Sequence, residues 1–192
     1  MKISLIGFMG SGKTSVGHEL AKILGFEFVE MDTVVLERAK FKNMQELFDS
    51  QGETHLREWE ISLAKEWQKK ENAVISTGGG VVMNRIIIDY LKKGKSHIVF
   101  LHAPFTTLEA RVVTDKTPRP LFRNGTEAYR LLRFRLPLYK RYSDFIIRTK
   151  GKNPQKIAQE IILKLYKNES PEANEASPLR EVVEQIMKVR NL

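Results

Sequence analysis

Residues 7–14 hold the residue types that bind phosphate groups. They read Gly-Phe-Met-Gly-Ser-Gly-Lys-Thr and fit the pattern G-x-x-x-x-G-K-[ST]. In this pattern glycines let backbone N–H groups converge on phosphate oxygens, Lys13 neutralises the charge of the β- and γ-phosphates, and the Thr14 hydroxyl is a ligand for Mg²⁺. We therefore expect a site for the phosphates of a nucleotide. Its predicted residues are Gly10, Ser11, Gly12, Lys13, Thr14 and Ser15.

The segments that flank this phosphate loop support the interpretation. Residues 3–6 are mainly apolar and favour a strand, and apolar residues at helical spacing follow the loop. A helix that opens near Ser11 points the positive end of its dipole at the same phosphates. The order of strand, glycine loop and helix is typical of a nucleotide-binding unit.

The chain is basic, and its positive charge is concentrated in one segment. The formal net charge is +9, and between Arg111 and Arg141 nine Lys or Arg residues stand against two acids. A solvated helix face and a basic clamp over phosphates both fit this pattern, and the phosphate loop favours the clamp. A nucleic-acid binder is an alternative, but the segment lacks an interleaved basic and aromatic strand pattern.

The elements that would position these residues alternate along the chain. Strands are expected at 3–6, 26–30, 73–76, 97–102 and 145–148. Helices are expected after the phosphate loop, from Met31, and at 44–49, 52–70, 84–92, 104–112, 126–142 and 154–166. Strands separated by helices indicate right-handed βαβ units. The predicted fold is a three-layer α/β/α domain with a five-stranded parallel sheet over residues 1–167.

Two segments depart from this alternation. Residues 113–124 contain two prolines, an asparagine and many charges, which predicts a charged lid rather than a helix. Residues 168–192 are expected to form a linker and a short extra helix, with Ser177 as its cap. Its predicted apolar face consists of Leu179, Val182, Val183, Ile186 and Met187. Docking of this helix on the domain is favoured over contact with a partner protein.

Length and composition limit the class of protein. A chain of 192 residues corresponds to one domain, and it contains no cysteine. No apolar run is long enough to span a bilayer, and the phosphate loop begins too early for a targeting peptide to precede it. We expect a cytoplasmic monomer that binds neither membranes nor nucleic acid. The four histidines lack metal-ligand spacing, so no zinc site is expected.

Four further motifs follow the phosphate loop. They are Glu30-Met31-Asp32, Gly52-Glu53-Thr54-His55-Leu56-Arg57, Gly78-Gly79-Gly80, and Arg119-Pro120-Leu121 with Arg135-Leu136-Pro137-Leu138-Tyr139. Together they resemble the shikimate kinase family over residues 1–166, with Glu30 where the family usually has Asp and Leu56 where it has Phe. The resemblance implies a fold similar to nucleoside monophosphate kinases. It also implies transfer of the ATP γ-phosphoryl group to the 3-hydroxyl of shikimate, in the pathway to aromatic amino acids.

The resemblance implies roles for residues on the acceptor side. Asp32 would accept a hydrogen bond from the substrate hydroxyls and act as a base. Arg57 and Arg135 would grip the substrate carboxylate, a task that suits the planar guanidinium group. The backbone N–H of Gly79 would meet the substrate, and Arg119 would close with the lid on the phosphates. The catalytic residues implied are Lys13, Asp32 and Arg119.

The resemblance also implies roles on the nucleotide side. Arg111 and Lys152 lie where the family surrounds adenine. Glu30 would help to hold Mg²⁺ through its water shell, with Thr14 as a direct ligand. Phosphoryl transfer needs positioned cations, a metal and a hydroxyl acceptor more than covalent chemistry, and this set of residues meets that need.

Two other functions remain open. A different small-metabolite kinase on the same scaffold, such as a gluconate kinase, would share the phosphate loop. Arg57, the glycine turn and the paired Arg119 and Arg135 motifs argue against it. A non-catalytic nucleotide-binding protein or switch is the other alternative. The chain has no Asn-Lys-x-Asp motif for reading guanine, and Thr114-Asp115-Lys116 does not supply one.

Overall fold

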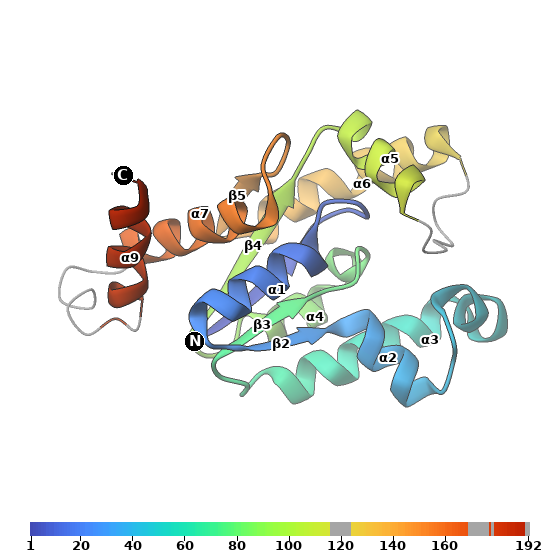
Figure 1. Ribbon diagram of the computed structural model, residues 1–192. Helices are drawn as coiled ribbons and strands as arrows, with labels where there is room; N and C mark the ends of the chain where they lie inside the picture. Colours follow the sequence, from blue (N-terminus) through green and yellow to red (C-terminus); the bar gives the residue numbers. More distant parts are fainter. Residues whose placement is uncertain (116–123, 169–176, 178, 191–192) are drawn as a thin grey trace.

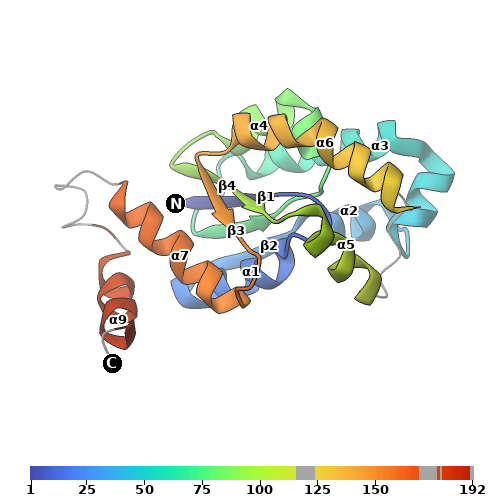
Figure 2. The same cartoon turned by 90° about the horizontal axis from the view of Figure 1, so that it is seen from above.

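The computed structural model describes residues 1–115, 124–168, 177 and 179–190. Its centre is a parallel sheet of five strands in the order β2-β3-β1-β4-β5. The strands are β1 (Lys2–Ile6), β2 (Glu27–Glu30), β3 (Ala73–Ser76), β4 (Ser96–His102) and β5 (Phe145–Arg148). Helices cover both faces of this sheet and give the protein three layers (Figure 1 and Figure 2).

Helices connect the strands and form the outer layers. They are α1 (Lys13–Leu24), α2 (Met31–Ala39), α3 (Met44–Trp67), α4 (Arg85–Leu91), α5 (Phe105–Thr114), α6 (Gly125–Tyr142), α7 (Pro154–Lys167) and α9 (Arg180–Arg190), with the 3₁₀ helix η1 (Val81–Met83) after β3. Helices α1 and α7 pack on one face of the sheet, and α3, α4 and α6 pack on the other (Figure 2). Among the described helices, none combines the length and the apolar character needed to cross a membrane.

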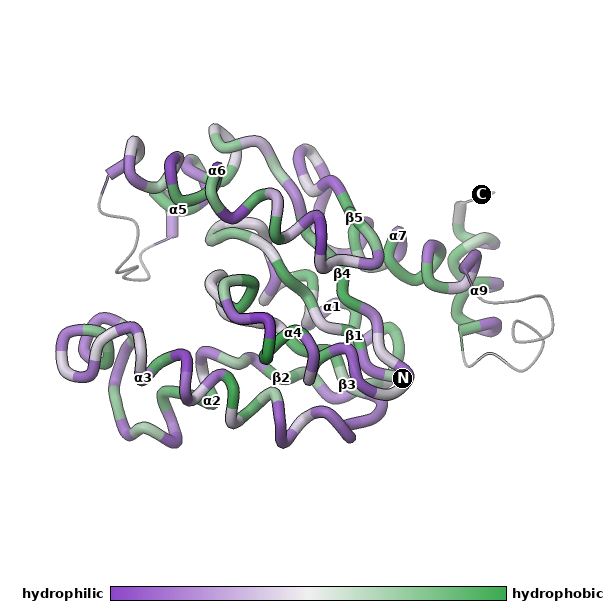
Figure 3. The backbone as a smooth tube through the Cα atoms, turned by 180° about the vertical axis from the view of Figure 1, so that it is seen from behind, coloured by the Kyte–Doolittle hydropathy of each residue, from purple (hydrophilic) through white to green (hydrophobic). Residues whose placement is uncertain are grey.

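The central strands are buried on both sides because their residues alternate between two cores. In β4, Ile98 and Phe100 belong to the core with α3, α4 and α6, whereas Val99 and Leu101 belong to the core with α1 and α7. All four residues are at most 2% exposed. The central strands are accordingly coloured mainly as hydrophobic (Figure 3). A parallel sheet covered on both faces requires such runs, and the predicted fold class is confirmed.

The predicted elements match the structure apart from shifts at their ends, and two of the differences have a clear backbone cause. Helix α1 begins at Lys13 rather than near Ser11, because Gly12 has a φ of 94°, outside the helical region. The two helices predicted at 44–49 and 52–70 form one helix, α3, which ends at Trp67. Gly52 interrupts its helical geometry with φ 76° and ψ 177°, so the predicted boundary survives as a kink.

Helix α9 docks on α7, as the sequence predicts. Leu179, Val183 and Ile186 are 1%, 9% and 6% exposed. The Ser177 hydroxyl oxygen accepts a hydrogen bond from the Leu179 N–H at 3.1 Å, which agrees with its predicted capping role. The prediction was wrong for Met187, which is 46% exposed. It lies about 100° around the helix from Ile186 and so outside the contact with α7.

The predicted lid is described only at its two ends. Helix α5 runs two residues beyond its predicted end, to Thr114. Asn124 caps α6 by accepting a hydrogen bond from the Glu127 N–H at 2.9 Å. Arg119 and the rest of the segment 116–123 lie outside the described residues. The linker at 169–176 also lies outside them, so the domain boundary near residue 168 stays a prediction.

Candidate active site

A cleft of about 590 Å³ opens at the carboxyl ends of the central strands. The phosphate loop after β1, the start of α2 after β2 and the glycine turn after β3 all line it. They meet because β3 pairs directly with β1, with Leu5 opposite Ser76. Helices α3 and α6 add Arg57 and Arg135 to the wall. The carboxyl edge of an open parallel sheet is the usual position for a ligand.

Glycines allow the phosphate loop to approach neighbouring backbone. A Cβ atom on Gly7 would lie 2.8 Å from the carbonyl oxygen of Leu101, and one on Gly10 would lie 2.7 Å from that of Leu108. Gly10 also has a φ of 75°, which residues with side chains rarely adopt. The Lys13 ammonium donates a hydrogen bond to the Gly7 carbonyl oxygen at 3.0 Å and lines the cleft. The structure therefore places this cation at the mouth of the loop.

Two serines of the phosphate loop differ in their surroundings. Ser15 lines the cleft beside Thr14. Ser11 is 1% exposed, and its hydroxyl has no hydrogen-bond partner among the described residues. A buried hydroxyl of this kind usually pairs with a ligand or an ordered water. Both positions therefore fit a loop that binds phosphate oxygens.

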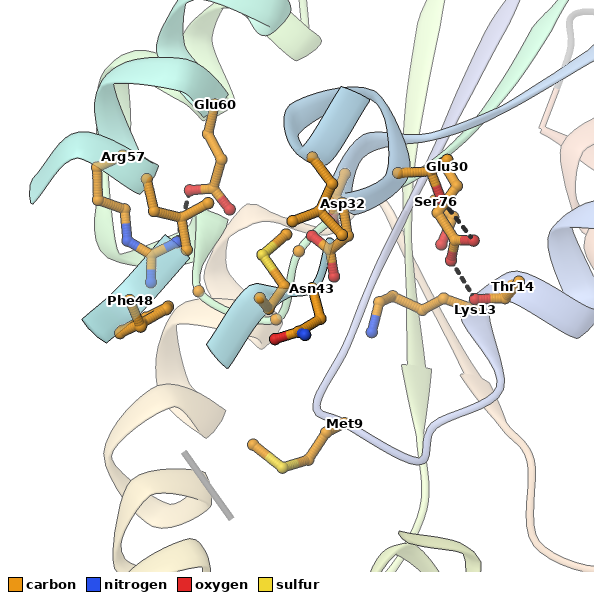
Figure 4. Close-up of a pocket in the computed structure, with 18 of the residues that line it drawn as sticks. Met9, Lys13, Thr14, Glu30, Asp32, Asn43, Phe48, Arg57, Glu60 and Ser76 are labelled. Atoms are coloured by element: carbon orange, nitrogen blue, oxygen red, sulfur yellow. Dashed lines mark hydrogen bonds and ion pairs between the residues drawn. The ribbon is translucent and has the colours of Figure 1, made fainter. Parts of the chain in front are cut away.

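Thr14 and Glu30 form a hydrogen-bonded pair of oxygen-bearing side chains at the opposite side of the cleft from Arg57 (Figure 4). The Thr14 hydroxyl donates a short hydrogen bond to Glu30 Oε1, and the Thr33 hydroxyl donates to Glu30 Oε2 at 3.5 Å. The described part of the chain holds no cluster of three His, Cys, Asp or Glu residues placed to bind a metal ion. Mg²⁺ does not need one, since it usually relies on one or two protein oxygens together with phosphates and waters. Thr14 and Glu30 therefore fit Mg²⁺ chemically.

Asp32 comes from the first turn of α2 and lines the middle of the cleft (Figure 4). A Cβ atom on Gly78 would lie 3.0 Å from Asp32 Oδ1 and 2.5 Å from Glu60 Oε1. The absence of a side chain at Gly78 thus lets two carboxylates approach the same turn. Asp32 is brought between the phosphate loop and the Arg57 side of the cleft, where a substrate hydroxyl could reach it.

Arg57 is held on α3 by two carboxylates. Its Nη1 pairs with Glu60 Oε2 at 2.5 Å, and its Nη2 pairs with Glu53 Oε1 at 2.6 Å. The Arg57 side chain is 14% exposed. Burial opposes its charge, but Glu60 and Glu53 together raise the pKa of the guanidinium. A Cβ atom on Gly80 would lie 2.0 Å from Arg57 Nη2, so only glycine leaves room for this arginine.

Glu60 is the most buried acid of the cleft, with a side chain that is 1% exposed. Burial raises its pKa to about 7, an effect that Arg57 opposes and the nearby Asp32 charge reinforces. The short ion pair with Arg57 favours an ionised Glu60, whereas its raised pKa favours the protonated form. Removal from water is the larger effect, so we expect Glu60 to bind a proton near neutral pH.

Arg135 lines the cleft from α6, and Tyr139 lies one turn further along the same helix. Arg135 is 3% exposed, and its Nη1 donates a hydrogen bond to the Gly79 carbonyl oxygen at 3.4 Å. The Tyr139 hydroxyl donates to the same oxygen at 2.6 Å. Burial lowers the pKa of Arg135, and Arg57 adds to this effect by repulsion. Two partly desolvated guanidinium groups therefore face one cleft, which suits it to an anionic ligand.

The two residues predicted to surround adenine lie apart from this cleft. Arg111 donates hydrogen bonds to the Gly10 carbonyl oxygen at 3.2 Å and to the Thr149 carbonyl oxygen at 3.0 Å. It thereby joins the phosphate loop to the segment before α7. Lys152 pairs with Glu160 through a short contact. Neither side chain is among the described residues that line the cleft, and their contact with adenine stays a prediction.

Comparison with known proteins decides the family. The family model for shikimate kinase matches residues 9–166. The chain is 39% identical over 163 residues to the shikimate kinase of Caldicellulosiruptor bescii. The alignment covers 83% of this chain and 92% of that protein. This chain belongs to the shikimate kinase family.

Other shikimate kinases agree in sequence and in structure. The shikimate kinase of Thermodesulfovibrio yellowstonii is 40% identical over 163 residues, covering 83% of this chain and 92% of that protein. The solved structure of shikimate kinase from Acinetobacter baumannii in complex with shikimate matches with a TM-score of 0.82 and 30% identity, over 88% of this chain and 94% of that one. The resemblance predicted from the motifs is thus confirmed over almost the same residues.

Sequence reasoning missed two residues of this shikimate kinase family site. Glu60 stands three residues after Arg57 on the same helix, a spacing at which side chains meet. Tyr139 stands four residues after Arg135 and therefore lies on the same face of α6. Both spacings were visible in the sequence. The signal was ambiguous, however, because the same spacings are common on solvated helix faces.

Proposed function

We propose that this protein is a shikimate kinase that transfers the γ-phosphoryl group of ATP to the 3-hydroxyl of shikimate. The observation that carries the proposal is the combination of two sites in one cleft. Lys13 and the phosphate loop lie at one side, and the partly buried Arg57 and the buried Arg135 lie at the other. A cleft that holds a phosphate cradle and a carboxylate grip suits a kinase for a hydroxylated acid.

The proposed chemistry depends on positioning. Arg57 and Arg135 bind the shikimate carboxylate and thereby fix the ring in the cleft. Asp32 accepts the hydrogen bond of the 3-hydroxyl and takes its proton as the bond from the 3-oxygen to the γ-phosphorus forms and the bond from that phosphorus to the bridging oxygen breaks, which releases ADP. Lys13 neutralises charge on the transferring phosphoryl group, which needs electrostatic stabilisation more than covalent help. Its present bond to the Gly7 carbonyl would be exchanged for phosphate oxygens.

Mg²⁺ and the nucleotide complete the proposal. Thr14 would be the protein ligand of Mg²⁺, and Glu30 would hold its water shell. When bound, the ion supplies charge neutralisation between the β- and γ-phosphates. Ser11 and the backbone of the phosphate loop would bind the phosphates, with Arg111 and Lys152 near adenine. Closure of Arg119 over the phosphates remains a prediction, as do the monomeric state and the cytoplasmic location.

A gluconate kinase is the nearest rival, and a non-catalytic nucleotide-binding protein is the second. Both would keep the phosphate loop. A gluconate kinase is disfavoured because Arg57, the glycine turn and Arg135 match the motifs of the shikimate kinase family, to which this chain belongs. A non-catalytic nucleotide-binding protein would not require a carboxylate such as Asp32 next to the two arginines proposed to bind the acceptor. These arguments favour shikimate as the acceptor.

A coupled assay with ATP and Mg²⁺ tests the proposal. ADP production is measured with shikimate, with gluconate and without an acceptor, and the site of phosphorylation is identified by NMR. We expect ADP formation that depends on shikimate and a product phosphorylated at the 3-hydroxyl. Lys13→Ala is the control and should reduce turnover by about a hundredfold or more. Turnover of gluconate but not of shikimate would refute the proposal, and so would ATP binding with no transfer.

A further inference from the structure

Tyr139 is buried in the middle of the acceptor side of the cleft without lining it. The residue is 0% exposed, and its ring stacks on Phe100 with ring centroids 5.0 Å apart and an angle of 15° between the ring planes. Its hydroxyl donates a hydrogen bond to the Gly79 carbonyl oxygen at 2.6 Å. A side chain packed this tightly can hold its hydroxyl in one place. The bond joins α6 to the glycine turn after β3.

The same hydroxyl lies next to Arg135. Arg135 Nη1 also donates to the Gly79 carbonyl oxygen, at the longer distance of 3.4 Å. Burial raises the pKa of Tyr139, and Arg135 is the group that most opposes this shift. The Arg135 Nε has no hydrogen-bond partner among the described residues. Arg135 is therefore positioned largely through the carbonyl and hydroxyl oxygens that Tyr139 brings together.

The bond to Gly79 also determines the direction of a backbone donor. A trans peptide is planar, and its C=O and N–H groups point in opposite directions. Because Tyr139 draws the Gly79 carbonyl toward α6, the N–H of Gly80 in the same peptide points away from α6. Both glycines line the cleft. The orientation of this peptide therefore determines what the turn offers to a ligand.

Steric contacts do not fix this peptide at Gly79. A Cβ atom on Gly79 would meet its nearest neighbour, the Gly7 carbonyl oxygen, at 3.6 Å, whereas those on Gly78 and Gly80 would clash with side-chain atoms. A side chain at Gly79 would therefore make only ordinary van der Waals contacts, so tight packing around its Cα atom does not restrain this residue. The hydrogen bond from Tyr139 supplies the restraint that close packing does not supply.

We propose that Tyr139 is a positioning residue for the acceptor: its hydroxyl fixes the Gly79–Gly80 peptide and Arg135 in the arrangement that binds the acceptor carboxylate. The inference rests on the proposed function, since it takes the acceptor to be shikimate. Tyr139 itself touches neither the acceptor nor the transferred phosphoryl group.

Tyr139→Phe removes the hydroxyl and keeps the ring that stacks on Phe100. We expect the acceptor KM to rise about tenfold, because a buried carbonyl loses its short bond and Arg135 loses its neighbour. The KM for ATP should stay within about twofold, and kcat should change little. Titration calorimetry with shikimate alone should show the same loss of affinity. Tyr142→Phe, on the same helix and half-buried, is the matched control and should leave all constants unchanged.

A double-mutant cycle separates positioning from general destabilisation. Arg135→Lys and Tyr139→Phe are combined, and the fold-changes in acceptor KM should be less than multiplicative because both act on one arrangement. If Tyr139→Phe lowers Tm but leaves the acceptor KM unchanged, Tyr139 is structural only and the inference fails. Tyr139→Met serves for the same comparison if the phenylalanine variant does not fold. If the wild type does not phosphorylate shikimate, the proposed function is wrong as well. If the wild type does so normally and Tyr139→Phe leaves the acceptor KM unchanged, only the role proposed for Tyr139 is wrong.

Discussion

Replacing Glu60 by glutamine should change how stability depends on pH. The wild-type carboxyl is 1% exposed, and burial raises its pKa from an ordinary value of 4.5 to about 7. Because the folded protein binds this proton more tightly than the unfolded chain, the contribution to stability is complete below about pH 4.5. It is lost progressively as the pH rises toward about 7. Glutamine keeps the shape of the side chain but does not titrate.

The magnitude follows from the two pKa values. At about 1.36 kcal/mol per pH unit, the free energy of unfolding of the wild type should fall by about 3 kcal/mol relative to Glu60→Gln between pH 4.5 and pH 7. Other titrating groups are common to both proteins and cancel in the difference. Above about pH 7 the difference should be constant.

Urea unfolding of both proteins at several pH values measures this difference directly. The acceptor KM should also rise in Glu60→Gln near pH 8, since Arg57 then keeps only Glu53 as a charged partner, with ATP binding less affected. Glu46→Gln, on the exposed first turn of the same helix, is the control. Two stability curves that run parallel from pH 4.5 to pH 7 would show that Glu60 is ionised throughout, and the argument from burial would be wrong.

Three further changes test other parts of the site. Glu30→Ala should raise the Mg²⁺ concentration needed for half activity and Glu30→Asp should be nearly neutral; an unmoved metal titration curve in the alanine variant would make Glu30 only a solvated acid. Gly80→Ala should raise the acceptor KM about tenfold or more, because the added Cβ would lie 2.0 Å from Arg57 Nη2 and displace that arginine. Gly79→Ala should change the acceptor KM little. Equal effects of the two substitutions would contradict the steric argument. Deletion of residues 168–192 should preserve kcat and reduce the unfolding free energy by about 2–5 kcal/mol through loss of the α9 contact; loss of catalysis in a folded truncation would place this tail in the site.

The sequence predicted those parts of the protein that depend on local pattern. The phosphate loop is defined by glycines and a lysine at fixed spacing, and the sheet is defined by short apolar runs between amphipathic helices. Gly52 illustrates the limit of such patterns. It marked a helix boundary correctly, but it could not tell whether the two helices would separate or continue as one kinked helix.

The parts that sequence could not predict depend on neighbours that are distant in the chain. The spacing of Glu60 from Leu56 and Leu63 places it on the apolar face of α3, but the sequence does not show that Gly78 leaves the space that its carboxylate occupies. Arg111 was expected near adenine from its place in the chain. The sequence did not predict that its guanidinium group also bonds Thr149, 38 residues away, and the carbonyl of Gly10. Such contacts follow from the packing of elements and not from the spacing of residues.

The order of the strands places the glycine turn, on the acceptor side, next to the phosphate loop. Because β3 pairs with β1, the Thr77 N–H and hydroxyl both donate to the Leu5 carbonyl oxygen, at 3.2 Å and 2.9 Å. The glycine turn and the phosphate loop therefore leave the sheet side by side. A Cβ atom on Gly79 would lie only 3.6 Å from the Gly7 carbonyl oxygen, the same oxygen that Lys13 contacts. The glycine turn and the Lys13 ammonium thus both lie near the Gly7 carbonyl oxygen. Any substitution that rotates the glycine turn should therefore affect the position of Lys13 as well as the binding of the acceptor.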